Sequence, residues 1–252
     1  MRHAAGPEGF RESLRVAARR ASARRGESRR FTGARGRTAA LLLAGPPRGM
    51  AGLLPMPPPE RHLLLVRHGE TDWNAAGRWQ GHTDVPLNAN GRAQALALAG
   101  RLRAEGVRAI GSSDLSRARG TAEILGEALG LEVAVLDPAL RERAYGAWEG
   151  LTRAQCESGY PREWARHVGD PQLAPPGGES MEALLARVVP AIHGAAERLD
   201  APALLVTHGG VMRAFLSAAP VPPPRTVPNC GVWRVRLVGG RIAAARPLDG
   251  ER

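Results

Sequence analysis

The sequence contains no lysine, so each of its 35 permanently basic side chains is an arginine. We interpret the accompanying abundance of Ala, Gly and Pro as the codon bias of a GC-rich genome, and the arginine excess is therefore weak evidence of nucleic-acid binding. The two cysteines, Cys156 and Cys230, match no zinc or redox spacing. Reduced thiols of a cytoplasmic protein are the expectation. No run approaches the roughly 18 apolar residues of a membrane span, so no membrane partner is expected.

Several motifs that mark cofactor and nucleotide chemistry are also missing. HExxH, paired CxxC and EF-hand patterns are absent, so we predict neither a metal nor another cofactor. The Walker phosphate loop is absent, which argues against a nucleoside triphosphatase. No GxGxxG pattern follows the first predicted strand.

The positive charge is concentrated at the N-terminus. Residues 1–59 hold 12 arginines and 3 glutamates, a net charge of +9 out of +11 for the chain. With little apolar periodicity and a Pro-rich end, this segment is predicted to be a disordered extension, and residues 60–252 to form one domain. Three interpretations stay open for the extension: translation that starts at Met50 or Met56, a targeting peptide, or a basic arm that binds polyanions. A nucleic-acid partner is expected only if that arm is genuine.

Two apolar runs end in the same dipeptide. Residues 63–66 lead into Arg67-His68-Gly69, and residues 203–206 lead into Thr207-His208-Gly209. Short apolar runs of this kind predict buried strands of a parallel sheet, and ligands bind beyond the carboxyl ends of such strands. We therefore expect His68 and His208 to face a common ligand.

The other predicted elements alternate between strands and helices, which indicates βαβ units and a mostly parallel sheet. Asn88 is expected to cap a helix whose Leu96, Ala99 and Leu102 share one face. Ser113 to Ser116 are expected to cap the next helix. The predicted ranges are strands at 107–112 and 131–136, helices at 117–129, 180–199 and 211–218, short cap helices within 152–170, and a closing hairpin of 232–237 with 241–245.

The polar groups at the predicted strand ends are mainly cationic. Arginine matches phosphate oxygens with two parallel hydrogen bonds, so two arginines and two histidines suit a dianionic phosphoryl group. Imidazole is also a competent nucleophile near neutral pH. If a backbone carbonyl accepts a hydrogen bond from one ring nitrogen, the other nitrogen is free to attack phosphorus.

Three motifs resemble those of the histidine phosphatase superfamily, in its phosphoglycerate-mutase-like branch, over residues 60–245. Arg67-His68-Gly69-Glu70-Thr71-x-x-Asn74 resembles the RHG[ED][ST]xxN signature. The run from Ser113 to Ala118 resembles S-x-L-x-R-A, and Leu140-Arg141-Glu142-x-x-Tyr145-Gly146 resembles the segment of the proton donor. The sequence departs from the family at Gly120, where glutamine is usual.

The resemblance implies a three-layer α/β/α sandwich with a small helical cap. It implies a nucleophile at His68 and a proton donor at Glu142. Phosphate-binding roles are implied for Arg67, Arg117, His208, Asn74 and Gly209. Substrate contacts are implied for Gln80, Gly81 and Tyr145.

The implied activity is metal-independent hydrolysis of a small phosphomonoester through a phosphohistidine, with bacterial α-ribazole phosphatases among the similar members. The first alternative is a 2,3-bisphosphoglycerate-dependent phosphoglycerate mutase. The 66-residue interval from Glu142 to His208 lacks the basic cluster of the mutases, and it ends in the Pro-Pro-Gly-Gly-Glu-Ser pattern of phosphatase members. The second alternative is a non-catalytic phosphate-binding module, which would require the loss of a catalytic residue.

Overall fold

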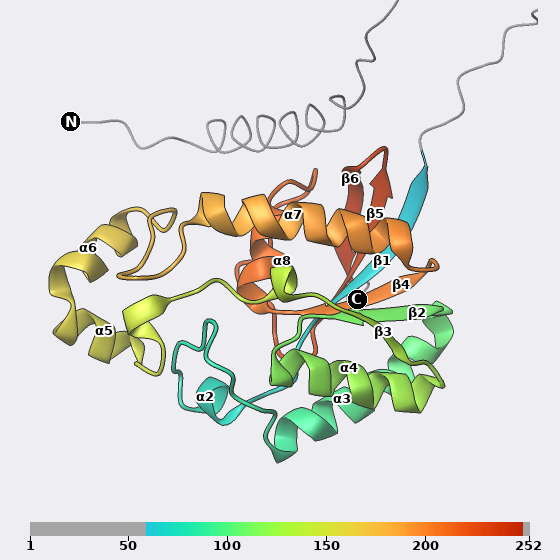
Figure 1. Ribbon diagram of the computed structural model, residues 1–252, viewed down its shortest axis with the longest axis horizontal. Helices are drawn as coiled ribbons and strands as arrows, with labels where there is room; N and C mark the ends of the chain where they lie inside the picture. The colour runs from blue at the N-terminus through green and yellow to red at the C-terminus, as the bar shows by residue number, and fades with distance from the viewer. Residues whose placement is uncertain (1–58, 249–252) are drawn as a thin grey trace, which may run out of the picture. The chain divides into compact units, whose positions relative to one another are not determined.

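The structure is a computed structural model that describes residues 59–248 (Figure 1). The predicted disordered extension, apart from Pro59, lies outside the described residues, and its disorder stays a prediction. Within residues 59–248, no helix combines the length and the apolarity that crossing a bilayer requires.

A six-stranded sheet forms the centre of the described region, in the order β3-β2-β4-β1-β5-β6. β3, β2, β4 and β1 run parallel, and β5 and β6 continue the sheet in antiparallel fashion, which confirms the prediction of a mostly parallel sheet. The strands are β1 (Glu60–Arg67), β2 (Ala109–Ser112), β3 (Val133–Leu136), β4 (Ala203–Thr207), β5 (Val232–Val238) and β6 (Arg241–Pro247).

Helices cover both faces of this sheet, as the predicted three-layer sandwich requires. In Figure 1, α3 (Ala89–Leu102) and α4 (Ser116–Leu129) lie below the sheet and α7 (Met181–Arg198) lies above it. Leu64 and Val66 of β1 pack in one core cluster with apolar residues of α3 and α4. α7 and α8 (Gly209–Leu216) contact β1 from the other side. Burial on both faces explains why β1 and β4 are continuous apolar runs.

The predicted cap consists of α5 (Arg153–Gly159) and α6 (Pro161–Gly169), which extend away from the sheet in Figure 1. A cluster of Tyr145, Trp148, Cys156 and Trp164 holds it together. The tryptophans therefore pack here, because a cap outside the main core needs an apolar centre of its own. The remaining short elements are α2 (Asp72–Ala75) and the 3-10 turns η1 (Arg103–Glu105), η2 (Pro138–Leu140) and η3 (Gly146–Trp148).

The start of α4 corrects one prediction. Leu115 occupies the N-cap position, and its side chain makes no capping hydrogen bond. The Ser116 N–H instead donates to Asp84 Oδ1 at 2.8 Å, from a loop 32 residues earlier. Ser113, which was expected to help cap the helix, has its hydroxyl 2.9 Å from His208 Nε2. A tertiary contact has replaced the local cap, and α4 continues without a break through Gly120.

The buried face of α3 corrects another prediction. Asn88 caps the helix as expected, accepting a hydrogen bond from Gly91 N at 2.8 Å. Leu96 does not share the face of Ala99 and Leu102, because its side chain is 63% exposed. The buried residues are Gly91, Ala95, Leu98, Ala99 and Leu102. These residues recur at helical spacing and form a buried stripe along α3 that does not include Leu96.

We expect Leu98→Ala to lower the free energy of unfolding by about 2–5 kcal/mol, because it opens a cavity where α3 meets the sheet. Leu98 is only 1% exposed. Leu96→Ala deletes the same atoms from the exposed side of the same helix and should change stability by less than about 0.5 kcal/mol. Urea unfolding of both variants measures the difference, and equal losses would contradict the assigned face.

Candidate active site

A pocket of about 270 Å³ opens beyond the carboxyl ends of β1 and β4. It brings together residues from five segments of the chain that are far apart in sequence. Nine of the ten sequence-predicted site residues line it: Arg67, His68, Asn74, Gln80, Gly81, Arg117, Glu142, Tyr145 and Gly209. The tenth, His208, lies behind this lining. In open α/β sheets this edge is where ligands bind.

His68 is held in one orientation by the backbone of the next residue, Gly69. Its Nδ1 donates to the carbonyl oxygen of Gly69 at 2.6 Å, because that oxygen can only accept. The hydrogen bond expected from the sequence is therefore present, and it leaves Nε2 with a lone pair. Burial lowers the pKa of His68 well below its usual value, and the charges of Arg117 and Arg67 lower it further. The ring is thus neutral near pH 7, which is the form in which an imidazole can act as a nucleophile.

His208 lies against His68 and is completely buried. The two ring centroids are 5.2 Å apart, with 61° between the planes. His208 Nε2 lies 2.9 Å from the hydroxyl of Ser113, a residue to which the sequence analysis gave no such role. Burial lowers the pKa of His208 as well, followed by repulsion from Arg117. Both rings are therefore uncharged, and the positive charge of the site belongs to arginine.

Arg117 supplies that charge from a buried position and Arg67 from a partly buried one. Arg117 is fully buried and donates to the carbonyls of Gly81 at 2.7 Å and Thr83 at 2.9 Å. Arg67 Nη1 donates to the carbonyl of Val227 at 2.6 Å. Burial lowers the pKa of Arg117 to about 10, so it stays charged at neutral pH.

Neither guanidinium joins an ion pair among residues 59–248, although Glu142 lies near enough for its charge to raise the pKa of both. The six ion pairs within that range leave both out, and the Nε of each is buried without a hydrogen-bond partner. A buried cation without a counter-ion is costly unless a ligand neutralises it. The geometry therefore favours an anionic ligand between Arg67 and Arg117.

Glu142 is the one carboxylate among the residues that line this pocket. Its Oε2 accepts a hydrogen bond from Gly210 N at 2.9 Å, and its Oε1 accepts one from Arg143 N at 2.8 Å. A Cβ atom at position 210 would overlap the carboxylate, which explains the glycine. Two other carboxylates near these motifs, Glu149 and Glu70, have other partners: Thr83 donates to Glu149 at 2.6 Å, and Asn88 donates to Glu70 at 3.0 Å.

A polar cluster holds the Glu142 backbone from behind. Arg187 donates to the carbonyl of Glu142 at 2.8 Å and forms a two-pronged ion pair with Glu179 at 2.7 and 2.8 Å. Arg143 donates to the carbonyls of Pro171 and Leu173, which anchors the cap loop beside it. Glu179 therefore orients Arg187, which in turn holds the Glu142 backbone.

The loop between α8 and β5 contributes residues that sequence reasoning missed. Thr226 and Val227 line the pocket. The side-chain amide of Asn229 donates to the His68 carbonyl at 3.1 Å and to Asn74 Oδ1 at 3.3 Å. No motif marks this Pro-rich segment. It reaches the site because β5 pairs with β1, so its position depends on strand order. Arg78, Trp79, Gly210 and Arg213 also line the pocket without a predicted role.

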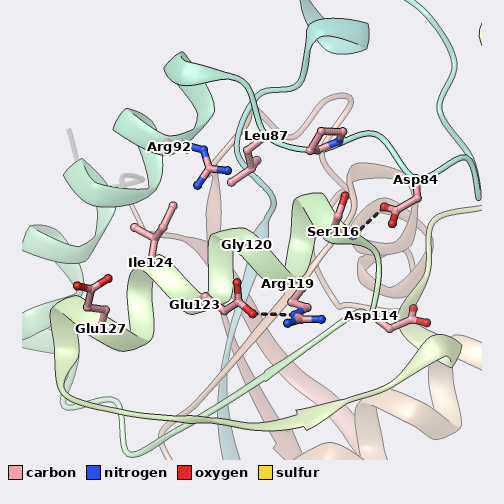
Figure 2. Close-up of a pocket in the computed structure, with 11 residues that line it drawn as sticks. Asp84, Leu87, Arg92, Asp114, Ser116, Arg119, Gly120, Glu123, Ile124 and Glu127 are labelled. Atoms are coloured by element: carbon pink, nitrogen blue, oxygen red, sulfur yellow. Dashed lines mark hydrogen bonds and ion pairs between the residues drawn. The ribbon is translucent and has the colours of Figure 1, made fainter.

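A second depression, of about 450 Å³, lies along α4 (Figure 2). Several of its charged groups already have partners: Arg119 pairs with Glu123 at 2.7 Å, and Asp84 accepts from Ser116 N (Figure 2). It contains neither predicted histidine. Chemistry rather than volume therefore identifies the site. Among residues 59–248, no cluster of three or more His, Cys, Asp or Glu is arranged to hold a metal ion.

Comparison with known proteins supplies independent evidence. A model of the histidine phosphatase superfamily (branch 1) matches residues 63–247. The chain is 43% identical over 168 residues to the glucosyl-3-phosphoglycerate phosphatase of Mycobacterium tuberculosis (strain ATCC 25618 / H37Rv), covering 63% of this chain and 74% of the relative. It is 39% identical over 186 residues to "Probable phosphoglycerate mutase GpmB" of Cronobacter sakazakii (strain ATCC BAA-894), covering 69% and 83%. The native structure of mycobacterial glucosyl-3-phosphoglycerate phosphatase superposes with a TM-score of 0.63 and 34% identity, covering 75% and 97%.

The lowered pKa of His68 predicts how stability depends on pH. Unfolded histidine has a pKa near 6.5, so between that value and the lower folded pKa the unfolded chain binds more protons. The stability that the folded chain gains from a neutral His68 is complete above about pH 6.5 and is lost as the pH falls toward the folded pKa. The slope is at most about 1.4 kcal/mol per pH unit for one histidine.

We expect His68→Asn to make the free energy of unfolding less sensitive to pH between about 6.5 and 5.5. Urea unfolding of the variant and the wild type at several pH values measures this. Between about pH 7.5 and 8.5, where the histidine effect is absent, the two proteins should show parallel curves. A variant as pH-sensitive as the wild type below pH 6.5 would show that the folded chain does not disfavour protonated His68.

Proposed function

The chain belongs to branch 1 of the histidine phosphatase superfamily, and on that premise we propose that it hydrolyses small phosphomonoesters through a phosphohistidine on His68. One observation carries the proposal. The Nε2 atom of His68 is left unprotonated in a pocket that has a single carboxylate and in which Arg67 and Arg117 each have a buried Nε without a hydrogen-bond partner. These are the nucleophile, the anion clamp and the proton carrier that phosphoryl transfer to an imidazole needs.

In the first step, the Nε2 lone pair of His68 attacks phosphorus and the ester P–O bond breaks. The leaving alkoxide takes a proton from Glu142, which would enter the step protonated and leave it as a carboxylate. Arg67 and Arg117 would hold the equatorial oxygens, on which charge spreads in the transition state. We assign Asn74, His208 and the Gly209 backbone to the same phosphoryl group.

In the second step, water occupies the place of the departed alcohol. Glu142 takes a proton from this water, the water oxygen attacks phosphorus, and the N–P bond breaks to release phosphate. Gln80 and Gly81 are proposed to contact the substrate and also to position neighbouring residues. Gln80 accepts from Thr71 Oγ1 at 3.0 Å, and the Gly81 carbonyl accepts from Arg117. Tyr145 packs on Trp79, with ring centroids 4.4 Å apart, and forms one wall of the pocket.

The natural ester is the finer part of the proposal. The sequence motifs resemble α-ribazole phosphatases, whereas relatives named above are a glucosyl-3-phosphoglycerate phosphatase and a protein named as a phosphoglycerate mutase. The short interval after Glu142 favours hydrolysis, and the similarity to GpmB keeps the mutase as the second candidate. A non-catalytic module is disfavoured because each predicted catalytic position is occupied.

We also propose that residues 60–252 form the phosphatase domain. The proposed location is the cytoplasm, since both cysteines are free thiols.

The deciding experiment is an assay of the purified full chain without added metal. It measures phosphate release from α-ribazole phosphate, 3-phosphoglycerate, glucosyl-3-phosphoglycerate and an aryl phosphate. A parallel reaction follows conversion of 3-phosphoglycerate to 2-phosphoglycerate with 2,3-bisphosphoglycerate present. Phosphate release supports the hydrolase, and conversion without release would make the chain a mutase.

His68→Ala should abolish both phosphate release and the phosphoenzyme, because no other group in the pocket replaces the nucleophile. The enzyme is quenched rapidly during turnover of labelled substrate, and the stability of the bound label in acid and in alkali is then measured. A phosphohistidine survives alkali, which distinguishes it from a phosphoester. Retention of a labelled enzyme in the variant would place the nucleophile elsewhere.

Glu142→Gln should slow the first step by about 10²–10⁴-fold for alkyl esters, whose leaving oxygens need a proton. Aryl phosphates with acidic leaving groups should be affected much less. Single-turnover kinetics over a leaving-group series tests this. The matched control is Glu70→Gln, a nearby carboxylate that does not line the pocket. A loss that is independent of the leaving group would remove Glu142 from the role of acid.

A further inference from the structure

The side-chain amide of Asn74 has a defined orientation. Its Oδ1 accepts a hydrogen bond from Thr71 N at 3.2 Å, and because an N–H group can only donate, the oxygen lies on that side. Asn229 Nδ2 donates to the same oxygen at 3.3 Å. Within residues 59–248, Asn74 Nδ2 makes no hydrogen bond, and the residue lines the pocket. The donor end of this amide is therefore available to a bound oxyanion.

Asn229 links this amide to the backbone of the nucleophile. Its Nδ2 also donates to the His68 carbonyl at 3.1 Å, and because that oxygen can only accept, the orientation of the Asn229 amide is fixed as well. An amide NH₂ group has two hydrogens, which is enough for both contacts. One side chain thus joins the peptide of His68 to the side chain of Asn74.

The turn that carries Asn229 has a strained backbone. Gly231 N donates to the Pro228 carbonyl at 2.9 Å and closes the turn. Cys230, between them, has a φ of +55°, a left-handed conformation that is costly for a residue with a β-carbon. Its N–H donates to the His68 carbonyl at 3.3 Å. Such strain persists where the surrounding structure holds it, and it gathers at functional sites.

His68 has further contacts that hold it without Asn229. Its N–H donates to the Thr207 carbonyl at 2.9 Å, and its carbonyl also accepts from Cys230 N. The orientation of its ring comes from the Gly69 carbonyl. Loss of the Asn229 side chain would therefore leave the nucleophile in place.

Asn74 has less support. It lies on α2, a helix of four residues, none of which is buried. The other donors to its Oδ1 belong to Thr71, on the same short segment. Among the described residues, Asn229 is the one partner that ties this amide to a distant part of the chain. The effect of losing Asn229 should thus be felt at Asn74.

We propose that Asn229 is a positioning residue for phosphoryl transfer, which aligns the Asn74 amide with the oxyanion that His68 attacks. This inference rests on the proposed function, since it places the reacting phosphoryl group beside His68. Asn229 is not among the residues that line the pocket, so it acts through Asn74 and does not touch the substrate.

The test measures the inhibition constant of vanadate against hydrolysis of an aryl phosphate by the full chain. Vanadate imitates the transferring phosphoryl group, so its binding reports interactions made in the transition state. Asn229→Ala should raise this constant by about tenfold, the effect of misaligning one hydrogen bond to a charged group. Asn229→Asp keeps the shape but places a carboxylate oxygen against two acceptors, so it should raise the constant at least as much. An inhibition constant does not depend on how much of the enzyme is folded.

A double-mutant cycle shows whether Asn229 acts through Asn74. Asn74→Ala alone should raise the vanadate constant by at least about tenfold, because the donor itself is lost. When Asn74 is already alanine, Asn229→Ala should raise the constant by less than about twofold, because the amide that it aligns is absent. If Asn229 served only the structure of its loop, its loss would raise the constant equally in both backgrounds, and that result overturns the inference.

Asn90→Ala is the matched control, because it deletes the same amide from an exposed position on α3 that does not line the pocket. It should keep the wild-type inhibition constant. An unchanged constant in both Asn229 variants, or an equal rise in Asn90→Ala, overturns the inference while leaving the phosphatase intact. Absence of phosphate release by the wild type from each ester tested would overturn the proposed function and this inference with it.

Discussion

The parallel pairing of β1 with β4 is the constraint on which the site depends. Leu63 to Arg67 align with Ala203 to Thr207, and the His68 N–H donates to the Thr207 carbonyl at 2.9 Å. This register carries both His-Gly ends to the same edge of the sheet and brings the two rings to a centroid distance of 5.2 Å. Both strands are buried between helical layers, so a shift of register would expose apolar side chains. The core thus fixes the positions of the reactive groups.

Burial of charge explains how the site is prepared for an anion. The guanidinium groups of Arg67 and Arg117 are fixed by backbone carbonyls, which orient them without neutralising their charge. The same burial, together with these cations, keeps both histidines neutral. A bound dianion would relieve the desolvation cost of the arginines and would meet an imidazole ready to attack. Binding and nucleophilicity therefore have one physical origin.

Much of the fold and the site could be predicted because it follows from local patterns. Apolar runs that end in His-Gly indicate buried strands with polar groups at their carboxyl ends, and Asn88 caps α3 through a contact three residues away. Prediction was wrong where distant groups compete with local ones. Ser113 was expected to cap α4, but its hydroxyl lies beside His208, and Asp84 accepts from the first turn instead. Leu96 was assigned to the core face because leucine is apolar, but it lies on the solvent-facing side of α3.

The sequence by itself determined the family and the two strands that end in His-Gly at one edge of the sheet. It also predicted the nucleophile, the arginines and the carboxylate, because each lies in a short motif. Only the tertiary structure decided what orients them. Arg187 reaches the Glu142 carbonyl from 45 positions away, and Asn229 reaches the His68 carbonyl from 161 positions away. Such contacts depend on strand order and helix packing, which no local pattern of residues encodes.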